Sequence, residues 1–274
     1  MFVTAILIFL GISFSISAKK NEENIQSNDL RVENLLRQMT TDVKIGQLVL
    51  VDKNAIQDMS DIARYGIGGL LSGGGDKPDT NTPAGWLNMV QQFQNAEQKS
   101  RLQIPLLYGV DAVHGHANVP GATIFPHEIG LAATHNADLV RKIGAITADE
   151  LTATGIQWNF APGLDVVEDT RWGRTYETFG SSSTVVSDLG AAYIQGLQSG
   201  SGQAHVIATA KHFLGTGAMA WGSSTNSQFK IDQGATLVDE KTLRAIHLPP
   251  FIAAINAGVE SVMVGHTSWQ VIIF

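Results

Sequence analysis

The 274-residue sequence contains no cysteine, so no form of the protein can be held together by disulfides and its stability must come from its core. Lys and Arg number 18 against 25 Asp and Glu, which gives a net charge of −7, and the basic residues form no cluster. Nucleic acids and anionic membrane surfaces bind clustered positive charge, so we expect neither as a partner. We also find no low-complexity tract and no internal repeat of about 20–50 residues.

No apolar run has the length of a membrane span. The longest, Phe2 to Ile16, is shorter than the ~20 apolar residues that a spanning helix requires, and it is followed by the small residues Ser17 and Ala18. This pattern predicts a secretory signal peptide at residues 1–18, with an uncleaved anchor as the alternative. A polar leader at 19–28 follows. We expect a secreted protein, extracellular or periplasmic, with no stable membrane insertion after cleavage.

The remaining sequence, residues 29–274, suits a single α/β domain. Its length is close to that of one barrel of about 250 residues, and short apolar runs alternate with longer amphipathic stretches. Strands that alternate with helices predict parallel pairing through right-handed crossovers, hence a (β/α)8 TIM-type barrel or a doubly wound sheet. We expect strands at Gly68–Ser72, Leu106–Asp111, Gln157–Ala161, Val206–Lys211 and Ser261–Gly265, and helices at Thr82–Arg101, Asn136–Thr154, Ser182–Gln198 and Asp239–Ala257. Asn136 is an expected N-cap, and Pro249-Pro250 should split the last helix.

Polar side chains follow three of these strands. Asp111, Lys211 and His266 lie at or just beyond the carboxyl ends, the rim on which (β/α)8 barrels carry their active sites. Asp111 comes directly after a buried strand and therefore needs a hydrogen-bond partner or an ion pair. It either caps the following turn or accepts hydrogen bonds from two neighbouring sugar hydroxyls.

Lys211 and His212 are consecutive, and consecutive strand residues point to opposite faces. Both can therefore line one site only if the strand ends there and the chain turns over Phe213 to Gly217. The alternative for Lys211 is a side chain that runs along the surface and carries its charge into solvent.

The segment RWGRTYE holds two arginines, Arg171 and Arg174, close to Asp169 and Glu177. We expect one arginine to form an ion pair with one of these carboxylates. The other would be free to donate a pair of hydrogen bonds to a ligand's hydroxyls or carboxylate.

No cofactor is expected. His114 and His116 are possible metal ligands, but no third Cys, His or carboxylate stands at metal-site spacing. The glycine-rich run from Gly66 to Gly75 has neither the GxGxxG pattern nor the lysine of a phosphate-binding loop. The sequence thus predicts neither a metal site nor a nucleotide site.

Six motifs occur in the order of one known family: MTTDVKIGQL, YGVDAVHGH, FPHEIGLAAT, RWGRTYE, KHFLGTG and VMVGHTSW. From about Asn28 to Trp269 the sequence resembles glycoside hydrolase family 3, specifically the N-terminal barrel of its β-glucosidase and exo-glucanase branch. The resemblance implies an incomplete barrel in which a terminal glucosyl unit occupies subsite −1. It assigns the binding of this unit to Asp111, Arg174, Lys211 and His212, and it places Met263 and His266 in the same pocket.

Three positions depart from the family pattern. His266 stands where Tyr is usual, and Thr216 where an acidic residue is common. Glu168 stands where an Arg or a neutral residue is often found.

The resemblance also implies the reaction, which is hydrolysis of terminal non-reducing β-D-glucosyl residues from β-glucosides or β-glucans with retention. An Asp nucleophile and a Glu acid/base, about 5–5.5 Å apart, would carry it. We expect the nucleophile beyond Phe274, in an SDW-like motif, and the acid/base in a second hydrolase domain that is also missing from this chain. This chain would supply the pocket and none of the catalytic carboxylates.

Two other functions remain open. The first is that of a β-N-acetylhexosaminidase, whose acid/base His and its partner Asp would stand in the loop after KHF. Here that loop reads GTGAMAWGSSTNSQ and contains neither residue type. The second is that of a non-catalytic sugar-binding protein or pseudoenzyme, which the missing carboxylates would suit.

Overall fold

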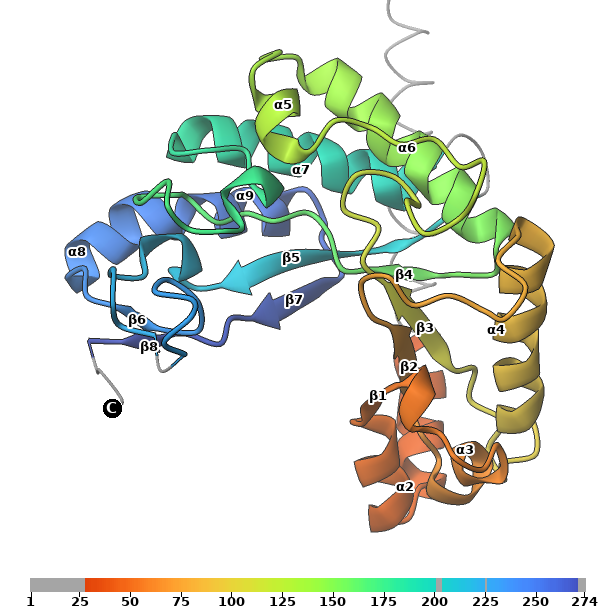
Figure 1. Ribbon diagram of the computed structural model, residues 1–274. Coiled ribbons are helices and arrows are strands. Elements are labelled where there is room, and N and C mark those ends of the chain that lie inside the picture. Colours follow the sequence, from red (N-terminus) through yellow and green to blue (C-terminus); the bar gives the residue numbers. More distant parts are fainter. Residues whose placement is uncertain (1–27, 201–203, 225, 271–274) are drawn as a thin grey trace, which may run out of the picture.

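A curled sheet of six parallel strands forms the centre of the molecule, and within this sheet the strands lie side by side in their chain order (Figure 1). The structure is a computed structural model that describes residues 28–200, 204–224 and 226–270. The predicted signal peptide and nearly all of the polar leader therefore lie outside the described residues. The strands are β1 (Leu50–Asp52), β2 (Gly69–Ser72), β3 (Leu107–Val110), β4 (Trp158–Asn159), β5 (Ile207–Phe213) and β7 (Ser261–Val264).

Helices follow the strands and cover the convex side of the sheet, while its concave side is open (Figure 1). They are α2 (Thr41–Gln47), α3 (Ser60–Tyr65), α4 (Pro83–Glu97), α5 (Glu128–Ala132), α6 (Ala137–Ala153), α7 (Ser183–Ser199), α8 (Glu240–Thr242) and α9 (Pro249–Asn256). Residues 28–38 are helical as well. This arrangement confirms the predicted fold, an incomplete TIM-type barrel.

The helix boundaries follow the capping residues of the sequence. Asn136 accepts a hydrogen bond from the backbone N–H of Leu139, so the predicted N-cap is confirmed, and Ser182 caps α7 in the same way. The predicted split at the prolines is also confirmed. A π-helical turn, η4 (Leu243–His247), precedes Pro249, with which α9 begins.

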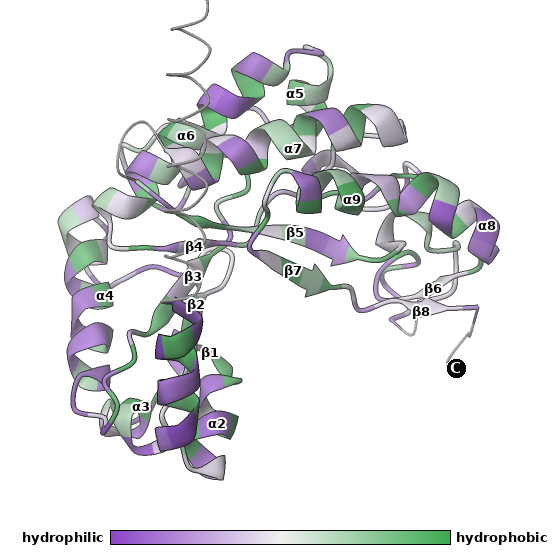
Figure 2. Ribbon diagram, turned by 180° about the vertical axis from the view of Figure 1, so that it is seen from behind, coloured by the Kyte–Doolittle hydropathy of each residue, from purple (hydrophilic) through white to green (hydrophobic). Residues whose placement is uncertain are grey.

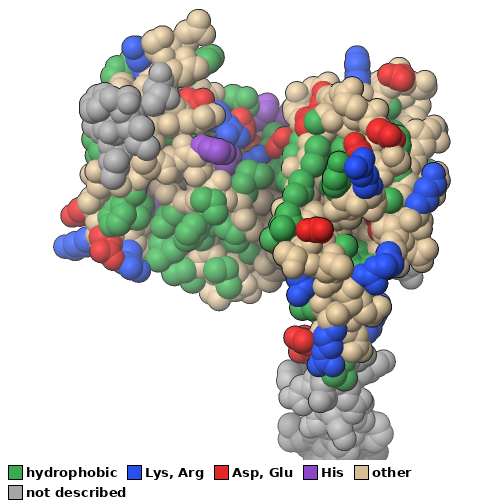
Figure 3. Space-filling model, turned by 90° about the horizontal axis from the view of Figure 1, so that it is seen from below, with side chains coloured by type: hydrophobic (Ala, Val, Ile, Leu, Met, Phe, Trp, Pro, Cys, Tyr) green, Lys and Arg blue, Asp and Glu red, His purple; other side chains and the backbone are tan. Residues whose placement is uncertain are grey.

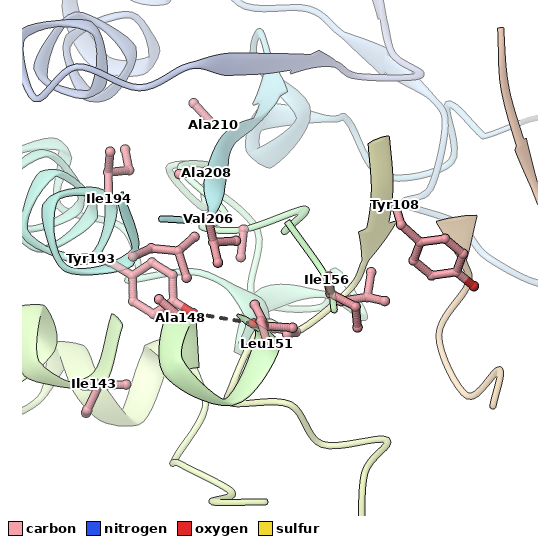
Figure 4. Packing of buried hydrophobic residues seen from close by; sticks show 14 of the residues in the cluster. Tyr108, Ile143, Ala148, Leu151, Ile156, Tyr193, Ile194, Val206, Ala208 and Ala210 are labelled. Carbon is pink, nitrogen blue, oxygen red and sulfur yellow. Dashed lines mark hydrogen bonds between the residues drawn. The ribbon is translucent and has the colours of Figure 1, made fainter. Parts of the chain in front are cut away.

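The core lies between the sheet and the long helices α6 and α7. Tyr193 and Leu151 are fully buried near Val206, the residue before β5, and the Tyr193 hydroxyl donates to the carbonyl of Ala112 at 3.4 Å (Figure 4). The long helices α4, α6 and α7 carry both apolar and polar residues (Figure 2), and most of their buried residues are apolar. α6 and α7 approach closely at Gly196, where an added Cβ would overlap the carbonyl oxygen of Arg141.

Several short elements were not predicted from the sequence, among them the helices α3 and α5. β1 is only three residues long and partly exposed, and a second parallel sheet joins β6 (Ala235–Thr236) to β8 (Ser268–Trp269). Elements of two or three residues are too short to carry a recognisable hydrophobic period.

The open side of the curled sheet carries apolar side chains (Figure 3). β1 and β7 are the edge strands of the described sheet, and Leu50, Val262 and Val264 on them are 39%, 45% and 71% exposed. Within the described ranges no helix is long and apolar enough to cross a membrane.

Candidate active site

One hollow of about 380 Å³ lies at the carboxyl ends of the strands. All six residues singled out in the sequence line it: Asp111, Arg174, Lys211, His212, Met263 and His266. They come from the ends of β3, β5 and β7 and from the long segment after β4. The structure thus brings the six together, while their role in binding a sugar stays a prediction.

Lys211 and Asp111 form an ion pair in the lining of this hollow. The Lys211 Nζ lies 3.2 Å from Oδ1 of Asp111, and the two side chains are 3% and 36% exposed. The buried ammonium is therefore compensated, while the carboxylate faces the hollow. Among the described residues, Oδ2 of Asp111 has no hydrogen-bond partner and remains available as an acceptor.

His212 and Arg174 belong to a second network of polar contacts, on the wall of the hollow. The Nδ1 of His212 lies 2.8 Å from Oδ2 of the buried Asp165, and its Nε2 lies 3.2 Å from NH1 of Arg174. Arg174 also donates from Nε and NH2 to the two carboxylate oxygens of Glu177, at 2.9 and 2.6 Å. Burial alone would raise the pKa of Glu177, but the hydrogen bonds from Arg174 hold this pKa below its ordinary value.

Our expectation that one of the two arginines stays free is wrong. Arg171 pairs with Asp169, with Nε 2.9 Å from Oδ1 and NH2 2.5 Å from Oδ2, while Arg174 pairs with Glu177. Each arginine has a carboxylate two or three residues away, so both pairs form locally. Of the three guanidinium nitrogens of Arg174, NH1 is the one not bound to Glu177, and it already contacts His212.

The expectation that the strand ends at Lys211 is also wrong, because β5 continues through Phe213. A bulge allows Lys211 and His212 to line the same hollow. Lys211 pairs with Met263 and Phe213 pairs with Val264, so His212 is the extra residue between two successive pairs. Such a bulge re-aims side chains that would otherwise alternate between faces.

The hollow has further residues that the sequence did not indicate as site residues, namely Leu50, Leu71, Phe160, Asp232, Gln233 and Val264. Asp232 is the most notable, since it adds a second acidic side chain to the lining. It stands in a segment without regular structure, and no periodic pattern or motif marks it. The residue after Asp232, Gln233, has a φ of 49°, which lies in the left-handed region.

The three departures from the family pattern have different surroundings. His266 and Thr216 both line the hollow, and the buried Thr216 hydroxyl has no partner in the described part of the chain. Glu168 lies outside the hollow, where its Oε1 is 2.9 Å from Nε2 of the buried His247. Glu168 therefore has a structural contact.

The two histidines of the HGH motif also make structural contacts. His114 Nδ1 lies 3.1 Å from the carbonyl of Phe125, and His116 Nε2 lies 3.1 Å from the Thr154 hydroxyl. Burial lowers the pKa of His116 to about 4, so this imidazole is neutral at physiological pH. Across residues 28–200, 204–224 and 226–270, no three His, Cys or acidic side chains are placed to hold a metal ion.

The chain is similar to known proteins over most of its length. Residues 40–272 match the model of the glycosyl hydrolase family 3 N terminal domain. The chain is 34% identical to a lysosomal beta glucosidase of Dictyostelium discoideum, over 91% of this chain and 34% of that protein. It thus spans about a third of the length of this curated relative.

Two solved structures are similar in fold. An exo-1,3/1,4-beta-glucanase from a Pseudoalteromonas species has 39% identity and a TM-score of 0.79, over 88% of this chain and 30% of that one. A beta-glucosidase from Listeria innocua in complex with glucose has 26% identity and a TM-score of 0.71, over 88% and 33%. The order of the motifs, the barrel and the family match lead to one conclusion: this chain belongs to glycosyl hydrolase family 3, to whose N-terminal domain it corresponds.

Proposed function

We propose that the protein hydrolyses terminal non-reducing β-D-glucosyl residues of β-glucosides or β-glucans with retention, and that this chain forms the glucosyl pocket. The observation that carries the proposal is the Asp111 carboxylate, held by the buried Lys211 at 3.2 Å and open to the hollow. One carboxylate with free lone pairs accepts hydrogen bonds from two adjacent hydroxyls. The relatives named as β-glucosidases and exo-glucanases support the choice of a β-glucosyl unit.

Each wall residue then has a distinct task. Lys211 neutralises and orients Asp111, whereas Arg174 and His212 present polar atoms on the neighbouring wall. Met263 supplies an apolar contact for the sugar ring. Hydroxyl contacts of this kind strengthen as the sugar acquires oxocarbenium character, and they therefore lower the barrier as well as bind the substrate.

We infer that the nucleophile and the acid/base come from residues that follow Phe274. In the described chain Asp111, Asp165, Asp169 and Glu177 are paired with Lys211, His212, Arg171 and Arg174 respectively, whereas Asp232 lines the hollow without an ion-pair partner among the described residues. The coverage of only 34% of the Dictyostelium relative supports the inference that the two catalytic carboxyls lie outside this segment.

The test compares Asp111→Ala with Asp188→Ala, an exposed aspartate on α7 that serves as the matched control. In the chain extended by the sequence that follows it in its gene, Asp111→Ala should lower kcat/KM for nitrophenyl β-glucoside by about 100-fold or more. Asp188→Ala should leave it unchanged. A loss below about threefold in a folded Asp111→Ala protein would remove Asp111 from the site.

The same assay separates the enzyme from a non-catalytic sugar-binding protein. The 274-residue chain alone should not hydrolyse the substrate, because without a nucleophile the two-step route is absent. The extended chain should be active. If the extended chain binds glucose without turnover, the protein is a sugar-binding module. If the short chain is as active as the extended one, the nucleophile must be sought among its own carboxylates.

We also propose that the protein is secreted and that residues 1–18 are removed. The support is the sequence pattern of a short apolar run followed by small residues. Mass spectrometry of the secreted protein should find Lys19 or a near neighbour at the N-terminus. Intact Met1 in a membrane pellet would instead identify the segment as an anchor.

A further inference from the structure

A buried carboxyl group lies close to the charged residues of the pocket and has no task in the function proposed above. Glu128 is the first residue of α5, its side chain is buried, and neither of its oxygens has a hydrogen-bond partner within the described ranges. A buried carboxylate without a partner is strongly disfavoured, so a carboxyl group in this position keeps its proton. Glu128 is therefore a neutral acid at a pH at which exposed glutamates are charged.

Ionisable groups from three neighbouring elements face Glu128. α5 packs against α7 and against the turn that carries Tyr176 and Glu177. The charge of Glu177 opposes ionisation of Glu128, whereas the charge of Lys211 on β5 favours it. Burial and, after it, the charge of Glu128 raise the pKa of Tyr193 on α7. Glu177 and, as a minor cause, Glu128 raise the pKa of Tyr176.

Tyr193 connects this buried region to the end of β3. Its hydroxyl donates at 3.4 Å to the carbonyl of Ala112, the residue after Asp111. Glu128, Lys211 and Tyr193 are all buried, so solvent screens the charges among them only weakly. The ion pair of Lys211 with Asp111 is therefore within the electrostatic reach of Glu128.

Lys211 has donors for more than one carboxylate. Its ammonium group carries three N–H donors on a flexible stem, and its one hydrogen bond among the described residues is the 3.2 Å contact with Oδ1 of Asp111. This distance is at the long end of the range for such bonds. The nearby Glu177 is bound to Arg174 instead. An ionised Glu128 would thus compete with Asp111 for the ammonium, and Asp111 would lose the contact that orients it.

We propose that Glu128 is a positioning residue of the glucosyl pocket: its neutral form leaves Lys211 to Asp111, and its ionised form draws Lys211 away and weakens sugar binding. The inference rests on the proposed function, because it needs a sugar that is held by Asp111. Burial raises the pKa of Glu128 to about 8, against the opposing effects of the residue's own backbone N–H and of Lys211. Glucose affinity should therefore be complete below this pKa and fall as the pH rises through it.

Calorimetric titration of glucose into the 274-residue chain at pH 7 and pH 9 tests the proposal. Loss of one hydrogen bond to a charged group weakens binding by about tenfold, and a pKa of about 8 makes this a fall of about fivefold between the two pH values. Glu128→Gln, which cannot ionise, should bind glucose equally well at both. Glu128→Asp, which keeps an ionisable carboxyl group, should retain a fall in affinity.

Glu97→Gln is the matched control. Glu97 is also a buried glutamate, but it lies on α4 and accepts hydrogen bonds from Gln98 and Ser100. Its substitution should leave the fall in affinity between the two pH values as it is in the unaltered chain. Circular dichroism at both pH values establishes that each protein stays folded, which separates weaker binding from unfolding.

A second measurement uses the unaltered chain alone. If ionisation of Glu128 weakens glucose binding, glucose must in turn raise the pKa of Glu128, because coupling between two equilibria is reciprocal. At pH 8 glucose binding should therefore take up about 0.4 of a proton, which appears as a dependence of the binding enthalpy on the ionisation enthalpy of the buffer. Glu128→Gln should remove this uptake.

The other outcomes identify which claim fails. If glucose binds the unaltered chain as tightly or more tightly at pH 9 than at pH 7, Glu128 does not act on the pocket, and the glucosyl pocket stands. If Glu128→Gln keeps the fall in affinity, another group causes it and the inference is equally overturned. If glucose binds at neither pH, the proposed function fails together with this inference.

Discussion

The side chain and the backbone of His212 are both held by the carboxylate of Asp165. Nδ1 lies 2.8 Å from Oδ2, and the backbone N–H donates to Oδ1 at 3.4 Å. Arg174 is a donor only, so its NH1, 3.2 Å from Nε2, requires Nε2 to be the acceptor. The ring proton therefore sits on Nδ1, and the neutral imidazole is fixed in one tautomer and one orientation.

Asp165→Asn should weaken the hydrogen bonding that orients His212, while it keeps a side chain of the same shape at position 165. The amide offers one acceptor in place of two, so either the Nδ1 bond or the backbone bond is lost and the ring is less well oriented. We expect glucose affinity to fall by about tenfold, the effect of losing one hydrogen bond to a charged group. Calorimetry checks this, with Asp188→Asn as the matched exposed control. Unchanged affinity in the Asp165→Asn protein would show that the orientation of His212 does not matter for binding.

Glu128 should make stability depend on pH. Its side chain is 1% exposed, and both carboxyl oxygens lack a hydrogen-bond partner among the described residues. Burial raises the pKa of Glu128 to about 8, against the opposing effects of the residue's own backbone N–H and of Lys211, and Glu177 adds to the rise. Between pH 4.5 and about 8 the unfolded chain loses this proton and the folded chain keeps it, so folding stability falls as the pH rises through this window.

Glu128→Gln removes that proton and keeps a side chain of similar shape. At pH 7 the free energy of unfolding should rise by about 1–3 kcal/mol, whereas at pH 4.5 it should change little. Urea denaturation at the two pH values measures the difference. Equal effects of the substitution at both pH values would mean that Glu128 is ionised in the folded protein and has a partner such as bound water.

The sequence alone could place most of the barrel and the composition of its pocket. Long elements such as α6 and α7 carry a clear hydrophobic period, and Asp111, Lys211 and His266 are marked by their position after apolar strands. Local ion pairs were foreseen only in part, because the sequence does not say which carboxylate is taken by which arginine.

The features that the sequence could not predict depend on contacts between residues far apart in the chain or on irregular backbone. The bond from His212 to Asp165 joins residues 47 apart, and His212 is the extra residue of the bulge in β5. Asp232 reaches the site through a segment with no periodic pattern. The position of this segment is decided by packing against residues 171–174, where Arg171 lies over the ring of Trp221, and not by local preference.

Gly196→Ala should destabilise the protein, even though alanine is ordinarily the better helix residue by about 1 kcal/mol. The reason is the close approach of α6 and α7, where a Cβ on Gly196 would overlap the backbone of Arg141 and lie near Ala145. We expect a loss of about 2–4 kcal/mol, as for overpacking in a rigid core. Gly74→Ala is the control, because nothing lies within 4 Å of its Cβ position. If Gly196→Ala gained stability, the two helices would have to separate without penalty.

The 274-residue chain, expressed on its own, should self-associate through its edge strand β7. β7 pairs with β5 alone among the described strands, and Val262 on it is 45% exposed, so it presents unpaired backbone groups beside apolar surface. Edges of this kind template pairing with another chain, and a lysine on the edge opposes such pairing. Light scattering after size-exclusion chromatography should therefore find oligomers at micromolar concentration, and Val262→Lys should shift them towards monomer.

Ile255→Lys is the control, because it removes a 64% exposed apolar side chain from α9 and leaves the strand edge unchanged. It should have the smaller effect on association. If the two variants reduce association equally, apolar surface and not the strand edge drives it, and if the unaltered chain is monomeric throughout, the edge is protected in solution.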